Sequence, residues 1–277
     1  MNAPAPIVRP GPAVGGAYLR TARQDQRLLA RQIARETGLS LETVRRIETG
    51  RALRDDHPGV DRLIDSYWPH WPVHALELSE IIRTRCCVTD RGEGARDRLA
   101  AVAAQSTSLS LASLDTIPAP LRAPRYRAAL GDTTPPFPGT TGLRAADRDT
   151  RLEIFLGEAA LHQLGDRDTA AEQLGLLLDV ARHHTVRIIG WNPHPDVGHV
   201  PLRSGYAYGH SRIGPVPVPF VDADGTGTSY PGPDEAFGVG YRLELCRQTA
   251  LSRDTSLTLL RAAYRDRTDR TPAALPA

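Results

Sequence analysis

The hydrophobic positions in the first third of the chain follow the spacing of short amphipathic helices. Apolar residues recur every three or four positions, which places them on one face of a helix. This pattern predicts helices over residues 17–26, 29–37, 41–50, 60–68 and 76–85. Residues 1–16 precede them and are rich in proline, glycine and alanine, which offer little surface to bury, so we expect a flexible arm there.

The rest of the chain mixes the two-residue period of strands with the helical period. Alternating apolar residues predict strands over residues 151–156 and 185–191, and two or three more within residues 198–230. Helical spacing predicts one helix that opens at Thr169 and another over residues 254–264.

Several local signals refine this second part. Thr169 and Glu172 have the spacing of a capping box at a helix start. Residues 106–115 are small and polar enough for a linker, but their alternating leucines also fit a strand. Residues 235–249 fit either a helix or a strand. The three prolines within residues 131–142 exclude both a helix interior and a central strand, so this segment predicts a break.

Residues 28–52 read LLARQIARETGLSLETVRRIETGRA and have the order of features found in a helix-turn-helix. Ala34 is small enough to let two helices approach closely. Gly38 can adopt the backbone conformation of a tight turn, and Ser40 can cap the helix that follows.

The helix predicted over residues 41–50 has an inward and an outward face. Val44 and Ile47 lie three residues apart and define the inward direction. At about 100° per residue, the opposite side carries the residues that we expect to face the major groove or its flanking phosphates. These are Glu42, Arg45, Arg46 and Thr49, with Thr43 at the edge of the same face.

This stretch resembles the Xre (Cro/repressor-like) family of helix-turn-helix regulators. The resemblance rests on G-L-S-x-x-T-V-x-R-I-E-x-G at residues 38–50 and on Y-L-R-x-A-R at residues 18–23, and it covers roughly residues 17–67. It implies a compact helical domain that binds double-stranded DNA.

The resemblance also carries implications for single residues. In that family, a glutamate at the position of Glu48 commonly pairs with an arginine of the first helix, which is here Arg20 or Arg23. Members usually begin the second helix with Thr or Ser and then a Gln that contacts phosphate. Leu29 and Ala30 hold these positions, and neither side chain can donate or accept a hydrogen bond. The departure implies weaker phosphate contacts at this helix.

The remainder of the chain resembles a class of bacterial regulators known chiefly from actinobacteria, which join an Xre-type module to an antitoxin-like C-terminal domain of unknown function. The matching stretches are IPAPLRAPRYRAAL at 117–130, IFLGEAALHQLGDRDTAAEQLGLLL at 154–178, VRIIGW at 186–191 with the later GH at 198–199, and TALSRDTSLTLL at 249–260. The resemblance implies a transcription regulator, often dimeric, that works with a small partner protein. It supplies no catalytic residues.

These features predict an α+β protein in which an N-terminal all-α helix-turn-helix bundle precedes a mixed α+β domain. The expected parts are a flexible arm at 1–16, an Xre-type helix-turn-helix domain at 17–68, a helical connector at 69–115, and an α+β domain for ligand binding, partner binding or dimerisation at 116–268.

Composition adds limits on location and partners. All 34 basic residues are arginines, which fits a GC-rich bacterial genome, and the formal net charge of +2 is too small to indicate nucleic acid by itself. Within residues 15–55, however, nine arginines stand against five acidic residues. With neither a membrane-spanning run nor a secretory signal, we expect a cytoplasmic protein. Cys86, Cys87 and Cys246 lack metal-site spacing and are expected to pack.

The second domain holds one candidate ligand pocket. Trp191, His199, Tyr206 and Tyr208, together with His210, could line an aromatic pocket for a small molecule. Alternating strand residues with one side in the core explain the same pattern, and we favour that interpretation.

The sequence contains one candidate metal-binding segment. His194 and His199, with Asp196 between them, could hold a metal, but the prolines around them favour a surface loop. No glycine-rich phosphate loop, GxSxG elbow or HExxH pair occurs. The sequence therefore predicts no catalytic residue, metal or cofactor.

Three functional hypotheses follow. The leading one is a DNA-binding transcription regulator, a homodimer that reads two half-sites about one helical turn apart and whose C-terminal domain dimerises and senses a small-molecule effector or a small partner protein. The second is a regulator-derived enzyme that acts on a small molecule in a biosynthetic pathway and has a degenerate helix-turn-helix. Leu29 and Ala30 suggest it, as does the proline-rich segment 131–142, which replaces a helix carrying Arg-Gln that is usual in the resembled class. The third is an antitoxin-like protein-interaction module.

Overall fold

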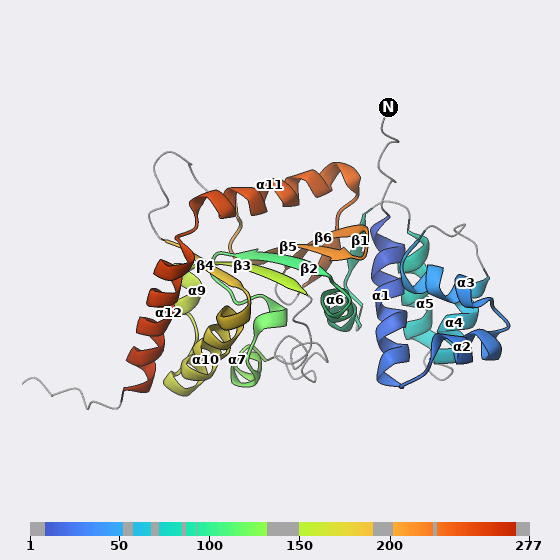
Figure 1. Ribbon diagram of the computed structural model, residues 1–277, viewed down its shortest axis with the longest axis horizontal. Helices are drawn as coiled ribbons and strands as arrows, with labels where there is room; N and C mark the ends of the chain where they lie inside the picture. The colour runs from blue at the N-terminus through green and yellow to red at the C-terminus, as the bar shows by residue number, and fades with distance from the viewer. Residues whose placement is uncertain are drawn as a thin grey trace, which may run out of the picture.

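The chain folds into a helical N-terminal region beside an α+β domain, as the sequence predicts (Figure 1). This computed structural model describes residues 9–51, 58–67, 72–84, 87–92, 94–131, 150–190, 202–223 and 226–269. The N-terminal helices are α1 (Pro10–Asp25), α2 (Ala30–Thr37), α3 (Leu41–Glu48), α4 (Gly59–Tyr67) and α5 (Pro72–Arg83). The α+β domain contains β1 (Val88–Asp90), α6 (Ala95–Ala104), β2 (Ser108–Ser113), η1 (Ala119–Leu121), α7 (Pro124–Ala129), β3 (Arg151–Gly157), α9 (Glu158–His162), α10 (Arg167–His183), β4 (Thr185–Ile189), β5 (Tyr206–Ile213), β6 (Val216–Ala223), β7 (Gly227–Tyr230), α11 (Pro233–Thr249) and α12 (Arg253–Thr268).

The described strands form one mixed seven-stranded sheet in the order β1-β7-β6-β5-β2-β3-β4. β2, β3 and β4 run parallel, and the other neighbours are antiparallel. The parallel pair β3 and β4 is joined by a crossover that includes α10, because parallel strands need a long connection. The described residues of 198–230 form three of the expected two or three strands, and the ambiguous segment 235–249 is helical.

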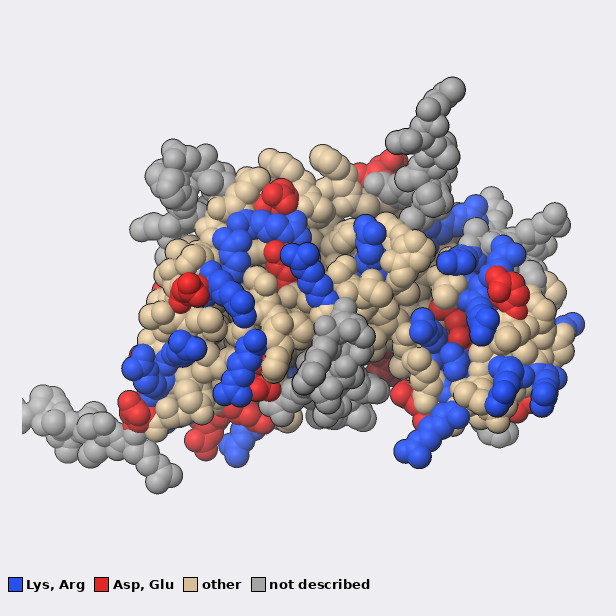
Figure 2. All heavy atoms as spheres, viewed as in Figure 1, with Lys and Arg blue, Asp and Glu red and all other residues tan. Residues whose placement is uncertain are grey.

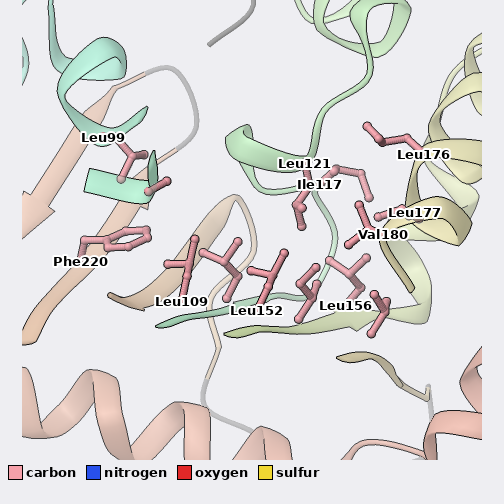
Figure 3. Close-up of a cluster of buried hydrophobic side chains, with 14 of the residues drawn as sticks. Leu99, Leu109, Ile117, Leu121, Leu152, Leu156, Leu176, Leu177, Val180 and Phe220 are labelled. Atoms are coloured by element: carbon pink, nitrogen blue, oxygen red, sulfur yellow. The ribbon is translucent and has the colours of Figure 1, made fainter. Parts of the chain in front are cut away.

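Helices cover both faces of this sheet. The larger core fills one face, where Leu99 of α6 and Leu177 of α10 pack against Leu109, Leu152 and other strand residues (Figure 3). A second cluster fills the opposite face beneath α11 (Figure 1). Both faces of the sheet are therefore covered by helices and contribute to a buried core.

The prediction of a flexible arm over residues 1–16 is wrong for the second half of that range. α1 begins at Pro10, and Gly11, Val14, Gly15 and Gly16 are buried. A Cβ atom at Gly11 would clash with the carbonyl oxygen of Ile81. A Cβ atom at Gly15 or Gly16 would also clash with a neighbouring helix. These three glycines are therefore the positions at which α5 and the end of α3 approach the backbone of α1. Residues 1–8 of the expected arm lie outside the described residues.

The expected helical connector at 69–115 was also wrong, because that range includes two strands of the sheet. β1 is an edge strand paired with β7, and β2 lies centrally between β5 and β3. The sheet domain therefore starts at Val88 rather than at residue 116. A strand of three residues is too short to show a two-residue period, and the polar alternate positions of β2 resemble those of a linker.

The predicted capping box at Thr169 and Glu172 does not form. α10 begins one turn earlier, with Asp166 as its N-cap, and the Asp166 carboxylate accepts a hydrogen bond from the backbone N–H of Thr169 at 2.8 Å. This hydrogen bond lowers the pKa of Asp166. Two candidate cap residues three positions apart made the sequence signal ambiguous.

α1 joins the two cores of the molecule. Its Leu19 packs in the core of the helical bundle with Ile33 and Val44. Its Ala13 and Val14 pack in the large core of the α+β domain. The bundle is therefore docked on the second domain through a shared helix.

A buried ionic cluster lies at the same junction. Arg98 of α6 is fully buried, and its Nε and NH2 atoms each donate to the carboxylate of Asp90 in β1 at 2.7 Å. Its NH2 atom also lies 3.4 Å from the carboxylate of Glu77 in α5. Burial alone would lower the pKa of Arg98, but hydrogen bonds and charge from Asp90 outweigh burial and raise it. The guanidinium thus connects the last helix of the N-terminal region to the edge of the sheet.

Candidate nucleic-acid interface

The turn between α2 and α3 forms as the sequence predicts. Gly38 ends α2 with a φ of 67°, a left-handed conformation that costs glycine little. The hydroxyl of Ser40 accepts a hydrogen bond from the backbone N–H of Thr43 at 3.0 Å and so caps α3. Leu39, between them, packs against the bundle core. These contacts fix the angle at which α3 leaves the turn.

α3 turns one face inward and one outward. Val44 and Ile47 are buried, as expected, whereas Glu42, Arg45 and Arg46 are exposed. The hydroxyl groups of Thr43 and Thr49 form hydrogen bonds to residues nearby in the chain. Ser40 and Thr43 share a hydrogen bond of 2.8 Å between their hydroxyl groups, and Thr49 donates to the carbonyl oxygen of Arg45 at 2.8 Å. Arg45 and Arg46 are therefore the exposed, positively charged side chains on this outward face.

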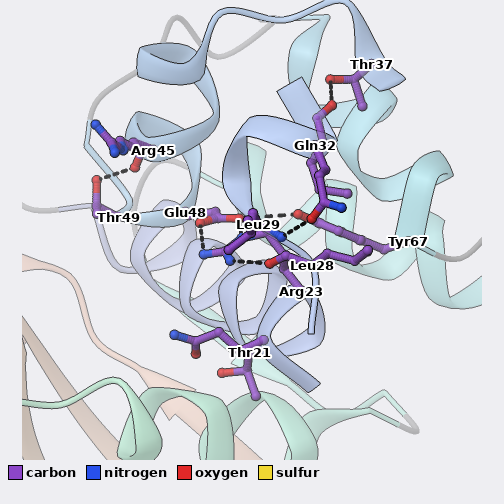
Figure 4. A network of polar contacts seen from close by, with 12 residues as sticks. Thr21, Arg23, Leu28, Leu29, Gln32, Thr37, Arg45, Glu48, Thr49 and Tyr67 are labelled. Carbon is purple, nitrogen blue, oxygen red and sulfur yellow. Dashed lines mark hydrogen bonds and ion pairs between the residues drawn. The ribbon is translucent and has the colours of Figure 1, made fainter. Parts of the chain in front are cut away.

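A hydrogen-bonded network ties α3 to α1 and α4 (Figure 4). Arg23 donates from Nε to Oε1 of Glu48 at 2.6 Å and from NH2 to Oε2 at 2.9 Å, which is a bidentate pair. The Tyr67 hydroxyl donates to the same carboxylate at 3.2 Å. The hydrogen bond from Arg23 to Glu48 raises the pKa of the guanidinium. Of the two arginines considered for Glu48, the structure selects Arg23 rather than Arg20.

We expect Glu48→Ala to lower the free energy of unfolding by about 1.5–3 kcal/mol, because it removes charge-assisted hydrogen bonds and leaves the mostly buried Arg23 guanidinium without an anion. Chemical denaturation measures the change. Glu42→Ala, on the exposed side of the same helix, is the matched control and should cost at most about 0.3–1 kcal/mol. Equal losses in the two variants would contradict a structural role for the network.

An open hollow of about 430 Å³ lies against the outward face of α3, with walls from α1, α2 and α3. Arginines dominate it, and Figure 2 shows blue side chains gathered over this end of the molecule. Its lining residues are Arg20, Arg23, Ala30, Glu42, Arg45, Arg46, Glu48, Thr49 and Arg51. The predicted residues Glu42, Arg45, Arg46 and Thr49 are therefore brought together, and Thr43 does not line the hollow.

The start of α2 borders this hollow without a polar side chain. Leu29 is 49% exposed, and Ala30 lines the hollow. The backbone N–H of Leu29 donates to the side-chain oxygen of Gln32 at 2.6 Å, which satisfies one of the free donors at the helix start (Figure 4). This end of α2 is therefore capped from within the chain, and its two first side chains offer no hydrogen bond to a ligand.

Three lining arginines were not assigned to the interface from the sequence. Arg20 and Arg23 were expected only as alternative partners for Glu48, and Arg51 was given no role. Arg20 precedes Arg23 by three residues on α1, so helical spacing could have placed both on one side. Arg51 follows the end of α3, where no periodicity predicts the direction of a side chain.

The candidate aromatic pocket is only partly within the described residues. Trp191 and His199 lie outside them. Tyr208 is buried beneath α11, with the guanidinium carbon of Arg242 5.3 Å from its ring centre, and Tyr206 packs at the edge of the same cluster. The burial of Tyr208 agrees with the alternative interpretation of alternating strand residues with one side in the core. The aromatic pocket stays a prediction.

Two further reactive groups of the α+β domain have perturbed pKa values. Burial, together with the charges of Arg212 and Arg247, lowers the pKa of His210, so its neutral form is favoured. Burial raises the pKa of the Cys246 thiol to about 12, which suits a packing residue rather than a nucleophile. Across the described ranges, no group of three or more His, Cys, Asp or Glu side chains could hold a metal ion. His194, Asp196 and His199 lie outside those ranges.

Two capped helices around a left-handed glycine, with arginines on the outward face of the second helix, define a helix-turn-helix protein of the DNA-binding type. Residues 16–67 match a family described as a helix-turn-helix domain. Residues 96–262, more than half of the chain, match the family described as Domain of unknown function (DUF5753), and the chain belongs to that family. No curated protein and no solved structure matches the chain. Within the described residues, no helix is long and apolar enough to span a membrane.

Proposed function

We propose that the protein is a transcription regulator that binds double-stranded DNA by placing α3 in the major groove. The observation that carries this proposal is the exposure of Arg45 and Arg46 on the outward face of a capped α3, within a basic hollow. Arginine donates two parallel hydrogen bonds to guanine or to phosphate. Glu42, on the same face, can accept from the amino group of cytosine.

We further propose that the regulator acts as a homodimer on two half-sites about one helical turn apart. One α3 of eight residues reaches only a few base pairs, so a second copy would supply the remaining specificity. The α+β domain is then the region that dimerises and senses a small molecule or a small partner protein. The packing of α1 in both cores supports this assignment of roles, because a conformational change in one core can be transmitted through α1 to the other.

The proposal is tested by selecting bound fragments from genomic DNA and titrating the selected duplex at several salt concentrations. Affinity should fall steeply with ionic strength, and Arg45→Ala should cost about 1–3 kcal/mol of binding free energy at the selected site. Arg261→Ala removes one exposed arginine from α12, far from the helix-turn-helix in Figure 1, and should leave binding unchanged.

Weak binding to every fragment without dependence on salt would overturn the proposal. It would favour the regulator-derived enzyme or the antitoxin-like interaction module. Light scattering of the free protein and of its complex with the duplex tests the dimer separately, because a monomer on DNA would leave the first proposal intact and refute the second.

A further inference from the structure

The hollow beside α3 is lined mainly by positively charged side chains. Its lining holds five arginines and two glutamates. Glu48 is committed to Arg23 in the bidentate pair, and this pair is mostly buried. Among the described residues that line the hollow, Glu42 is the acidic residue outside this pair.

Arg20 and Arg51 line the hollow from different parts of the bundle. Arg20 comes from the middle of α1 and is half-buried, whereas Arg51 follows α3 and is exposed. Within the described part of the chain, neither side chain makes an ion pair or a hydrogen bond to a neighbour. Each guanidinium can thus offer its donors to a ligand without breaking an internal contact.

The position of these two arginines fits a contact to the DNA backbone rather than to a base. Arg45 and Arg46 project from α3 itself, the element that enters the groove. Arg20 and Arg51 belong to the elements that flank α3, and side chains that flank a recognition helix reach the phosphates beside the groove. The start of α2 lies on the same rim but presents Leu29 and Ala30, which cannot bind phosphate through their side chains.

We propose that the hollow receives a backbone phosphate of the bound duplex and that Arg20 and Arg51 donate hydrogen bonds to its oxygens. These two arginines thereby supply the phosphate contact that Leu29 and Ala30 cannot make. The inference rests on the proposed function and deepens it by naming the residues that anchor the recognition helix. The same chemistry would accept a free inorganic phosphate, so the test separates the two sources.

The test measures the affinity of a fluorescent duplex about two helical turns long by anisotropy at a series of salt concentrations. Arg20→Ala and Arg51→Ala should each weaken binding roughly tenfold at low salt. Each should also reduce the slope of log affinity against log salt by about 0.9, the value for one lost phosphate. The loss should be the same for a selected and a random sequence, because a phosphate contact carries no sequence information.

Two further variants separate an anchor from a structural residue. Arg20→Lys keeps the charge and should retain most of the salt slope while losing part of the affinity, since lysine cannot bind in a bidentate manner. Arg261→Ala removes a single exposed arginine from α12 and should alter neither quantity. Thermal unfolding of each variant confirms that the fold is intact.

The outcomes distinguish this inference from the proposed function. If the wild-type protein binds the duplex in a salt-dependent manner and Arg45→Ala weakens it, but Arg20→Ala and Arg51→Ala keep the full slope, only the phosphate anchor is refuted. If inorganic phosphate binds the wild type, loses affinity in Arg20→Ala, and duplex binding is unaffected, the hollow is a small-anion site instead. Absence of salt-dependent duplex binding in the wild type refutes the proposed function itself.

Discussion

Asp90→Ala is expected to lower the free energy of unfolding by about 3–5 kcal/mol, because it leaves the fully buried guanidinium of Arg98 without its bidentate partner. Glu77 remains 3.4 Å away but is partly exposed and cannot replace two hydrogen bonds of 2.7 Å. Chemical denaturation measures the loss. Because β1 and α5 both depend on Arg98, the same variant should loosen the docking of the bundle, which limited proteolysis between residues 84 and 95 would detect.

Asp61→Ala is the matched control for this prediction. Asp61 pairs with Arg83 at 2.6 Å, but the two side chains are 48% and 40% exposed, so the removal of Asp61 should cost no more than about 1 kcal/mol. Arg98→Met combined with Asp90→Ala should recover much of the stability, since no charge then remains buried. A loss in Asp90→Ala as small as that in Asp61→Ala would show that the buried pair does not hold the junction.

Gly16→Val is expected to destabilise the protein by about 3 kcal/mol, at the upper end of the cost of overpacking. A Cβ atom at Gly16 would clash with the carbonyl oxygen of Ile47 and approach the backbone nitrogen of Gly50 within 2.9 Å. These are backbone atoms at the end of α3, so they cannot rotate away as a side chain can. α3 should shift on α1, and duplex affinity should fall even though Gly16 lies outside the basic hollow.

Gly240→Val provides the comparison for Gly16→Val. Gly240 also lies inside a helix, α11, but a Cβ atom there would meet no atom within 4 Å. The change in helix propensity from glycine to valine is only a few tenths of a kcal/mol, so stability and duplex affinity should both stay near wild-type values. If Gly16→Val is equally harmless, the close approach of α1 and α3 does not set the position of the recognition helix.

The glycines of α1 show why the sequence misled at its start. A segment rich in proline, glycine and alanine has the composition of a mobile arm, and the same residues allow a helix to be approached closely by its neighbours. Gly11 and Gly16 are distinguished from linker glycines only by α5 and α3, which lie many residues further along the chain. Composition could not reveal those neighbours.

The helix-turn-helix likewise combines features that local sequence predicts with features that depend on how its helices pack. The turn at Gly38, the cap at Ser40 and the inward face of α3 follow from local rules, and all three form as predicted. The choice of Arg23 over Arg20 as partner for Glu48 depends on the angle between α1 and α3, which no spacing specifies. The gathering of Arg20 and Arg51 around the hollow depends on that same angle.

The class of the fold, the helix-turn-helix and the outward position of Arg45 and Arg46 follow from the order of amino acids alone, because each depends on hydrogen bonds and periodicity within about twenty residues. Packing between distant segments was needed to show that α1 is shared by two cores, that β1 and β2 belong to the sheet, and that Arg98 is buried at the junction. Those features depend on contacts between residues that are far apart in the chain. Such contacts leave no local sequence pattern from which the contacting residue could be identified.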